Sequence, residues 1–149
     1  MLRWIDIPPF WLLVALAGAV AIDRALPGWG FGLTWTVWLG YGLVAAGLAL
    51  MVAAVAQFLA ARTSFIPRRR PEAFLKSGIY RLTRNPIYLG DALVLTGVIV
   101  ILDAPVALIL VPLFGWFITR RFIRGEEAGL VAAFGDEAHA YMAQVRRWL

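Results

Sequence analysis

Two polar segments carry the residue types that could do chemistry in a chain that is otherwise strongly apolar. Residues 77–90 read SGIYRLTRNPIYLG, and residues 120–130 read RRFIRGEEAGL. Arginine and glutamate together suit a zwitterion, because a guanidinium donates to a carboxylate and a carboxylate accepts from an ammonium group. Apolar helix ends beside them would contact an apolar or aromatic part of the same ligand. The two segments therefore predict a pocket for a zwitterion that carries an apolar or aromatic part.

Each segment also has an interpretation without chemistry. Asn85 and Pro86 are typical of a helix start, with Asn as the N-cap and Pro in the first turn. The tyrosines and arginines of residues 77–90 could form an ordinary belt of aromatic and cationic side chains at a membrane interface. Arg124 precedes Glu127 by three residues, which is the spacing of a surface ion pair worth under about 1 kcal/mol. The chemical hypothesis therefore depends on whether the two segments meet in space.

The elements that position these segments are four apolar helices. The 149 residues are 62% hydrophobic and 15% charged, and a water-soluble chain of this length could not bury so much apolar surface. We predict an all-α integral membrane protein with a single domain. Transmembrane helices are expected over residues 7–24, 34–61, 86–102 and 104–124, with a cytoplasmic loop over 62–85 and cytoplasmic amphipathic helices within 125–149.

The third and fourth predicted helices form a tight antiparallel hairpin. Only Asp103 separates them, and it suits the N-cap position before a first-turn Pro105. Pro112 is expected to bend the fourth helix, and Gly135 to break the helical region that follows it. Because the two polar segments adjoin the two arms of one hairpin at the same membrane face, we expect them to be neighbours in space.

The arginine distribution predicts how the chain crosses the membrane. Of the 14 Lys and Arg residues, all except Arg24 fall on one side of the predicted bilayer. Because cytoplasmic segments are enriched in Lys and Arg, we expect a multi-pass protein of the cell (inner) membrane with both termini cytoplasmic. The first apolar segment also imitates a signal peptide, but Asp6, Pro8 and Pro9 lie in its would-be basic region and favour a retained membrane helix.

Several classes of site are excluded by composition. The chain has no Cys and a single His, His139, so neither thiolate catalysis nor a Cys- or His-built metal site is expected. The net charge of +5 does not indicate a nucleic-acid partner, because the basic residues are grouped between apolar runs. Residues 28–32 (GWGFG) resemble a nucleotide-binding loop but lie in a non-cytoplasmic connection, where we expect a flexible turn. No strand–glycine loop–helix unit appears in the sequence, so no Rossmann sheet is expected.

The order of the motifs resembles that of one superfamily of integral membrane enzymes. Over about residues 63–147, SGIYRLTRNPIYLG is followed by a hairpin and then by RGEEAGLVAAFGDEAHAYMAQVRRWL. This looks like the isoprenylcysteine carboxyl methyltransferase and phospholipid methyltransferase superfamily, with its Gly-x-Tyr, Arg-His/Asn-Pro-x-Tyr-x-Gly, Glu-Glu and Phe-Gly motifs and a late Tyr. Asn85 stands where the motif often has His, so a His general base is not expected there, and His139 stands where Tyr is frequent.

The resemblance implies S-adenosylmethionine bound without a Rossmann sheet, with S-adenosylhomocysteine as the product. The acceptor would be a lipid-like or prenylated small molecule that enters sideways from the lipid bilayer. By motif, the cofactor-binding residues would be Tyr80, Arg84, Asn85, Pro86, Tyr88, Leu89, Gly90, Glu126 and Glu127, and the catalytic residues Arg121, Arg124 and Glu127. Glu126 and Glu127 would hold the cofactor's amino group or ribose. Arg121 or Arg124 would take its carboxylate or orient the acceptor.

The acceptor group stays open, as do two other functions. A carboxylate acceptor is already ionised at pH 7, whereas an amine acceptor needs a base, for which Glu127 or a Tyr is a candidate. A membrane reductase of the sterol or steroid type, using NADPH, would share a similar loop and hairpin, although the Glu-Glu pair and the small size favour methyl transfer. The third hypothesis is a non-catalytic helical scaffold or small transporter subunit. Asp91 is the one ionisable residue expected mid-membrane, and a substrate pathway would normally carry more.

Overall fold

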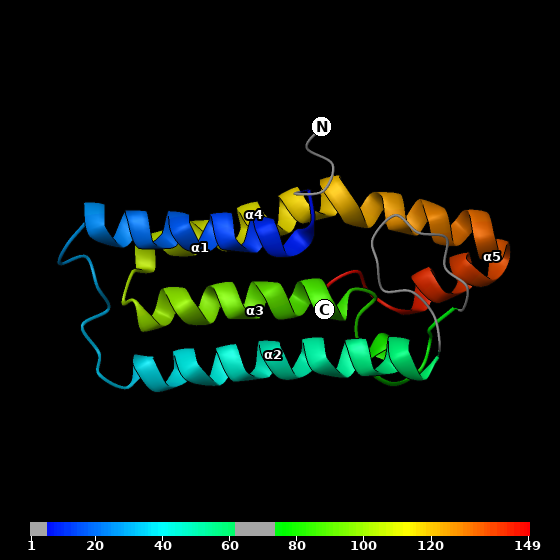
Figure 1. Cartoon of the computed structure of the whole chain (residues 1–149), viewed down its shortest axis with the longest axis horizontal. Helices are drawn as coiled ribbons and strands as arrows, with labels where there is room; N and C mark the ends of the chain where they lie inside the picture. The colour runs from blue at the N-terminus through cyan, green and yellow to red at the C-terminus, as the bar shows by residue number, and fades with distance from the viewer. Residues whose placement is uncertain (1–5, 62–73) are drawn as a thin grey trace.

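The computed structural model describes residues 6–61 and 74–149, and this part of the chain is helical with no strand (Figure 1). The predicted all-α class without a sheet is therefore confirmed. The elements are α1 (Pro8–Ala25), α2 (Thr36–Ala60), η1 (Gly78–Arg81), α3 (Pro86–Ile101), η2 (Pro105–Ile109), α4 (Leu110–Ile118), η3 (Thr119–Ile123) and α5 (Arg124–Gln144). Residues 62–73 of the predicted cytoplasmic loop lie outside the described residues.

The long helices lie side by side, and α3 takes the central place (Figure 1). It contacts α2 on one side and both α1 and α4 on the other. The connections that follow α1 and α3 lie at one end of this bundle. At the opposite end lie η1, the start of α3 and α5, which extends past the other helices (Figure 1). Residues 77–90 and 120–130 therefore share one end of the molecule.

Within residues 6–61 and 74–149, three helical runs are long and apolar enough to cross a bilayer, namely α1, α2 and the continuous run Pro105–Gln144. α3 is also apolar but shorter, with 16 residues. The outer faces of α1 and α2 are apolar too, since Leu13, Val52 and Trp38 are 64%, 68% and 74% exposed. Such a surface is unfavourable in water, whereas lipid tails solvate it. The chain is therefore a membrane protein.

Glycines bring α2 and α3 into close antiparallel contact. A Cβ at Gly47 would lie 2.6 Å from the carbonyl oxygen of Gly90, and a Cβ at Gly97 would lie 2.6 Å from that of Gly40. Small residues at such positions let two helix backbones approach closely inside a membrane. This contact holds the first turns of α3, and with them the Asn-Pro motif, against α2.

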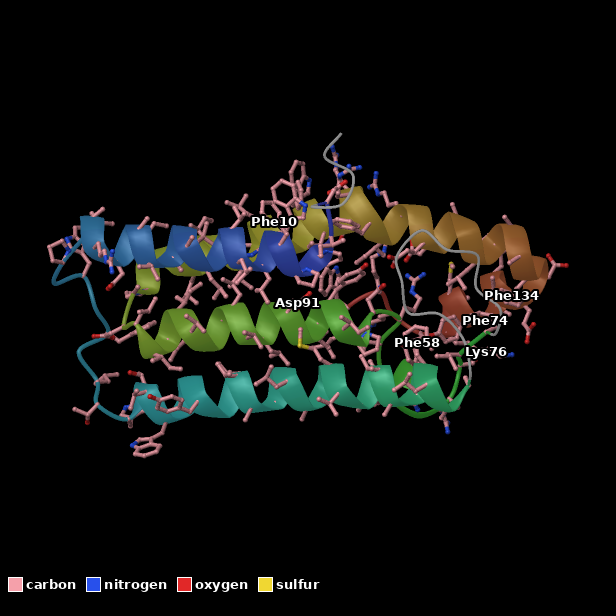
Figure 2. The ribbon with its side chains drawn as sticks, viewed as in Figure 1. Phe10, Phe58, Phe74, Lys76, Asp91 and Phe134 are labelled. Atoms are coloured by element: carbon pink, nitrogen blue, oxygen red, sulfur yellow. The ribbon has the colours of Figure 1, made fainter. Side chains whose placement is uncertain are left out.

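A buried apolar core joins α3 to α1 and α4. It includes Leu95 of α3 and Phe114 of α4, and it continues through Phe122 of η3 to Tyr88, whose ring centroid lies 6.5 Å from that of Phe122. Burial of this apolar area stabilises the contact and fixes the position of Tyr88. Asp91 is 1% exposed within α3 (Figure 2). It therefore faces other helices rather than lipid, as ionisable residues in membrane helices usually do.

Asp103 does not have the predicted N-cap role. Ala104 occupies the N-cap position of η2, and Asp103 has a left-handed backbone with a φ of 55°. Its carboxylate instead accepts hydrogen bonds from the backbone N–H groups of Phe31 (2.7 Å) and Gly32 (3.3 Å). The glycine-rich connection, which we expected to be a flexible turn, is therefore tied to the hairpin turn by a carboxylate that satisfies two of its backbone donors.

The helix predicted over residues 104–124 is divided in the structure. The 3₁₀ turn η2 comes first, and α4 begins at Leu110. Pro112 lies in the first turn of α4, directly after the 3₁₀ turn, and the expected bend at Pro112 stays a prediction. The helical run also contains η3, a π-helical turn between α4 and α5. Single π-helical turns of this kind are frequent at functional sites.

Gly135 breaks α5, as predicted, because it has a φ of 52° inside the helix. After it the chain turns back toward the start of α3 (Figure 1). Side chains from the segment before η1 hold this turn (Figure 2). The Phe74 and Phe134 rings stack with centroids 4.9 Å apart, and Lys76 forms an ion pair with Glu137. The return brings the last residues of the chain to the two polar segments.

Candidate functional site

The two polar segments meet through direct side-chain contacts. The Tyr88 hydroxyl donates to Glu126 Oε1 at 2.7 Å, and Arg84 Nη1 lies 3.0 Å from Glu127 Oε1. Tyr88 is buried, and the side chains of Arg84 and Glu127 are only 14% and 15% exposed. The expectation that the segments are neighbours is confirmed. Arg84, Tyr88, Glu126 and Glu127 form one largely buried cluster, which we name the Glu-Glu cluster.

Arg147, which was not among the site residues expected from the sequence, completes the Glu-Glu cluster. Its Nε and Nη2 donate to the two oxygens of Glu127, at 2.9 and 2.7 Å. This bidentate contact with Glu127 raises the pKa of Arg147, so the guanidinium stays charged. Glu127 therefore lies between the guanidiniums of Arg84 and Arg147. Its expected neighbour along the helix, Arg124, is exposed and forms no ion pair with any described residue.

The C-terminal segment, residues 145–149, positions Arg147. The backbone N–H of Arg84 donates to the carbonyl oxygen of Arg146 at 3.0 Å. The carbonyl oxygen of Arg147 accepts from Asn85 Nδ2 at 2.9 Å and from Thr83 Oγ1 at 3.2 Å. These contacts attach the end of the chain to residues 83–85, so the bundle end is closed by three segments rather than two.

Asn85 has the predicted position but not the predicted side-chain contact. It is the N-cap residue of α3, and Pro86 is the first helical residue. The Asn85 side chain makes no capping hydrogen bond, and its Nδ2 donates to the carbonyl oxygen of Arg147. The Asn85 backbone N–H donates to Thr83 Oγ1 at 3.2 Å. Asn85 thus joins the start of α3 to the C-terminal segment, and its part in cofactor binding stays a prediction.

Tyr80 belongs to η1, just before Thr83, and its side chain is buried. Its ring contacts Phe58 edge-on, with centroids 5.7 Å apart, and its carbonyl oxygen accepts from the Tyr141 hydroxyl at 2.6 Å. Burial raises the pKa of Tyr80 well above its ordinary value, with further contributions from Tyr141 and Glu126. Burial also raises the pKa of Tyr141 to about 12. Both phenols therefore stay protonated at neutral pH, and neither is suited to accept a proton.

Three of the predicted cofactor-binding residues have clear structural surroundings. Pro86 is fully buried at the helix start. Leu89 is half-buried, and its N–H donates to the Asn85 carbonyl oxygen at 2.9 Å within the first turn. Gly90 faces α2, since a Cβ there would lie 2.7 Å from the carbonyl oxygen of Gly47. Helix contact alone accounts for this glycine, and a cofactor contact of Gly90 stays a prediction.

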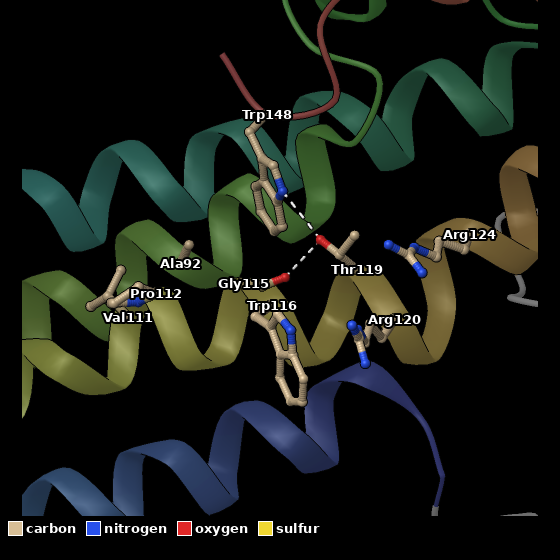
Figure 3. A pocket seen from close by; sticks show the side chains of 9 residues that line it. All are labelled: Ala92, Val111, Pro112, Gly115, Trp116, Thr119, Arg120, Arg124 and Trp148. Carbon is tan, nitrogen blue, oxygen red and sulfur yellow. Dashed lines mark hydrogen bonds between the residues drawn. The ribbon is translucent and has the colours of Figure 1, made fainter.

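The two predicted catalytic arginines point to different surroundings. Arg121 forms an ion pair with Asp6, just before α1, and its side chain is 49% exposed. Arg124 lines a groove between α3 and α4 (Figure 3). Neither forms an ion pair with Glu127. Among the predicted site residues, Arg84 is the one whose guanidinium lies beside Glu127.

This α3–α4 groove is an open cavity of about 530 Å³ (Figure 3). Its lining residues are Ala92, Val111, Pro112, Gly115, Trp116, Thr119, Arg120, Arg124 and Trp148. Trp148 Nε1 donates to Thr119 Oγ1 at 3.3 Å, and the Thr119 hydroxyl donates to the Gly115 carbonyl oxygen at 2.7 Å. Because Trp148 directly follows Arg147, the C-terminal segment lies between the groove and Glu127.

A comparison with known proteins shows which family the chain belongs to. A sequence model of the phospholipid methyltransferase family matches residues 35–137, which is more than half of the 149 residues. The chain belongs to the phospholipid methyltransferase family. The matched range includes α2, α3, α4 and, within the Glu-Glu cluster, Arg84, Glu126 and Glu127. No curated protein and no solved structure matches the chain. The superfamily predicted from the motifs is thereby confirmed.

Membership of the phospholipid methyltransferase family implies a membrane methyltransferase, and this family is generally S-adenosylmethionine-dependent. The Glu-Glu cluster fits a zwitterionic ligand of that kind. Arg84 Nε is buried and has no hydrogen-bond partner among the described residues, so it can donate to a ligand carboxylate. The carboxylates of Glu126 and Glu127 are acceptors for a ligand ammonium group.

Proposed function

We propose that this family member is an S-adenosylmethionine-dependent methyltransferase that acts on an amphiphilic acceptor at the cytoplasmic face of the membrane. The observation that carries the proposal is the Glu-Glu cluster, in which Tyr88 contacts Glu126 and Arg84 contacts Glu127. The methionine end of the cofactor has one ammonium and one carboxylate group. The cluster offers acceptors for the first and a donor for the second in a largely buried setting, where such hydrogen bonds are strong.

The roles of the side chains follow from their present contacts. We assign the cofactor carboxylate to Arg84, because its Nε lacks a partner in the described part of the chain. Glu126, which Tyr88 orients, is assigned to the ammonium group or the ribose. Glu127 accepts from two guanidiniums and thereby orients Arg84. Arg84 takes the role that the motifs had given to Arg121 or Arg124.

The chain's contribution to the reaction is mainly alignment. When bound, S-adenosylmethionine would supply an electrophilic methyl group, to which a lone pair of the acceptor would bond while the electrons of the carbon–sulfur bond return to sulfur and leave S-adenosylhomocysteine. A site that holds both reactants in line gains most from proximity. Tyr88 is 6% exposed and donates to Glu126, so this contact of the cluster is sheltered from water. A carboxylate acceptor would require no proton transfer, whereas an amine acceptor would require a base.

We place the enzyme in the cell (inner) membrane with both termini cytoplasmic. The arginines of the Glu-Glu cluster and of the α3–α4 groove lie at the bundle end that the arginine distribution assigns to the cytoplasm. Cofactor would then reach the cluster from the cytosol, and a lipid-like or prenylated acceptor would come from the bilayer.

Direct ligand binding to the purified, detergent-solubilised protein tests this function. We expect S-adenosylhomocysteine to bind and to raise the unfolding temperature, because it presents the same ammonium and carboxylate groups as the cofactor. NADPH should have no effect. Calorimetry with the opposite preference would reject methyl transfer and support the reductase, and binding of neither ligand would support a scaffold.

A further inference from the structure

Asp91 is a buried carboxyl group that the proposed roles leave unused. It lies in the apolar helix α3 and is 1% exposed (Figure 2). Its Oδ2 atom is buried and has no hydrogen-bond partner among the described residues. A buried polar atom without a partner is unfavourable and rare, so packing of the helices gives no reason for a carboxyl group at this position. Ionisable residues inside membrane helices usually mark a functional site.

Asp91 lies close to the Glu-Glu cluster along α3. It follows Tyr88 by three residues, and residues three apart share one face of a helix. With a rise of about 1.5 Å per residue, Asp91 is about 4.5 Å further along the helix axis than Tyr88. The Tyr88 hydroxyl contacts Glu126, and the residue after Asp91, Ala92, lines the α3–α4 groove. Asp91 therefore lies less than one helical turn from the cluster and next to a residue of the groove.

The proposed cofactor contacts direct attention to the same turn of α3. In S-adenosylmethionine, the sulfonium is only a few bonds from the carbon that carries the ammonium and carboxylate groups. We assigned those two groups to Glu126 and Arg84. A site that holds them there places its chemistry within reach of the neighbouring turn of α3, to which Asp91 belongs.

The cluster itself offers no group that is suited to take a proton from the acceptor. Both oxygens of Glu127 accept from guanidiniums, and Glu126 accepts from a tyrosine hydroxyl. Burial raises the pKa of Tyr80 and of Tyr141, so both phenols stay protonated at neutral pH. The carboxyl oxygen nearby that has no partner in the described part of the chain is Oδ2 of Asp91.

We propose that Asp91 Oδ2 contacts the methyl-accepting group and takes its proton during methyl transfer. This inference rests on the proposed methyltransferase function. A lone pair of the accepting atom forms the bond to the methyl carbon, the electrons of the carbon–sulfur bond return to sulfur, and the proton of the accepting atom moves to Asp91 Oδ2. The carboxylate also stabilises the positive charge that develops on the accepting atom. The accepting group is therefore a neutral group that carries a proton, and not a carboxylate.

Binding of dodecylamine to the purified protein in nonionic detergent tests the contact without turnover, in the presence of S-adenosylhomocysteine. Dodecanoate is the comparison probe. Asp91→Asn should weaken dodecylamine binding about tenfold or more, because it removes a charge-assisted contact, and should leave the affinities for dodecanoate and S-adenosylhomocysteine unchanged. Asp136→Asn is the matched control. Its exposed side chain on α5 changes the net charge equally, so the affinity for dodecylamine should equal that of the wild type.

Thermal unfolding without any ligand separates this role from a structural one. A buried carboxyl oxygen without a partner lowers stability, so an apolar side chain at this position should be tolerated better than the carboxyl group. Asp91→Val should therefore raise the unfolding temperature and abolish dodecylamine binding. A lower unfolding temperature for both Asp91→Val and Asp91→Asn would show that the carboxyl group holds the helices together, and would overturn the inference.

Turnover tests the proton transfer itself. With S-adenosylmethionine that carries a labelled methyl group, the wild-type protein should methylate dodecylamine, and Asp91→Asn should not. Transfer by Asp91→Asn at the wild-type rate, or transfer to dodecanoate in preference to dodecylamine, would overturn the inference.

The outcomes separate this inference from the proposed function. Wild-type affinity for dodecylamine in Asp91→Asn would overturn the assignment of Asp91, whatever the protein does with S-adenosylhomocysteine. Weaker dodecylamine binding by Asp91→Asn in a protein that does not bind S-adenosylhomocysteine would support the contact of Asp91 and reject methyl transfer.

Discussion

Glu126 and Glu127 are adjacent in the chain, yet their side chains have different partners. Glu127 is enclosed by the guanidiniums of Arg84 and Arg147, whereas Glu126 accepts from the neutral hydroxyl of Tyr88. Removing the charge of Glu127 would leave two partly buried guanidiniums facing each other. An amide at position 126 could still accept from Tyr88. At the scale of single residues, Glu127 therefore holds the two guanidiniums of the cluster together, whereas the proposed function assigns Glu126 to the ligand.

Two substitutions distinguish these roles. Glu127→Gln should lower the free energy of unfolding by about 1.5–3 kcal/mol, since hydrogen bonds to charged groups are worth that much, and should also abolish methyl transfer. Glu126→Gln should leave the unfolding temperature near that of the wild type but weaken S-adenosylhomocysteine binding about ten- to a hundredfold. Thermal unfolding and calorimetric titration of both variants are the measurements. Wild-type ligand affinity in Glu126→Gln would remove Glu126 from the proposed site.

At the scale of elements, the site depends on how closely α2 and α3 approach. Gly47 and Gly90 form one close contact, and Gly40 and Gly97 form another further from the site. The motif resemblance gives Gly90 a place in the cofactor site, whereas the geometry gives it the same environment as Gly97. Close helix contact requires a small residue at both Gly90 and Gly97, whereas a ligand contact is predicted for Gly90 alone.

Substituting alanine for Gly90 and for Gly97 shows whether Gly90 contacts a ligand in addition to α2. Gly90→Ala would place its Cβ 2.7 Å from the Gly47 carbonyl oxygen, and Gly97→Ala would place its Cβ 2.6 Å from that of Gly40. Both should destabilise the protein by similar amounts, about 1–3 kcal/mol, because backbone atoms cannot move aside as a flexible side chain can. The folded fraction of each should bind S-adenosylhomocysteine with equal affinity. Weaker binding by Gly90→Ala alone would show that Gly90 contacts the ligand.

At the scale of the whole molecule, the proposed function requires the Glu-Glu cluster to face the cytosol. The connection after α1 lies at the opposite end of the bundle from α5 (Figure 1). Because the chain has no cysteine, single introduced cysteines report topology without background. Trp29 and Ala143 are exposed at the two ends.

In intact cells, a membrane-impermeant maleimide should label Trp29→Cys and not Ala143→Cys. Both should react after the cells are opened, which controls for accessibility of the thiol. The reverse pattern would place the C-terminal region outside and contradict cytosolic access of the cofactor. It would also contradict the predicted topology, which rests on the enrichment of arginine in cytoplasmic segments.

Much of the architecture was determined by the sequence alone, because it depends on short stretches of chain. The apolar runs predicted membrane helices, Pro86 marked the first residue of α3, and Gly135 marked the break in α5. The meeting of the two polar segments was also predictable, because one short hairpin joins them. Each of these features follows from local backbone chemistry or from a connection too short to allow alternatives.

Only the tertiary structure decided which charges meet. Arg124 is three residues from Glu127 and was its expected partner, yet Arg147, twenty residues further on, is the one that binds it. That pairing requires the reversal at Gly135 and the attachment of residues 146–147 to Thr83, Arg84 and Asn85. Hydropathy and spacing describe single elements, whereas an ion pair selects its partner from every charge that folding brings within a few ångströms. For the same reason, the sequence could not show that Arg120 and Arg124 have no ion-pair partner among the described residues.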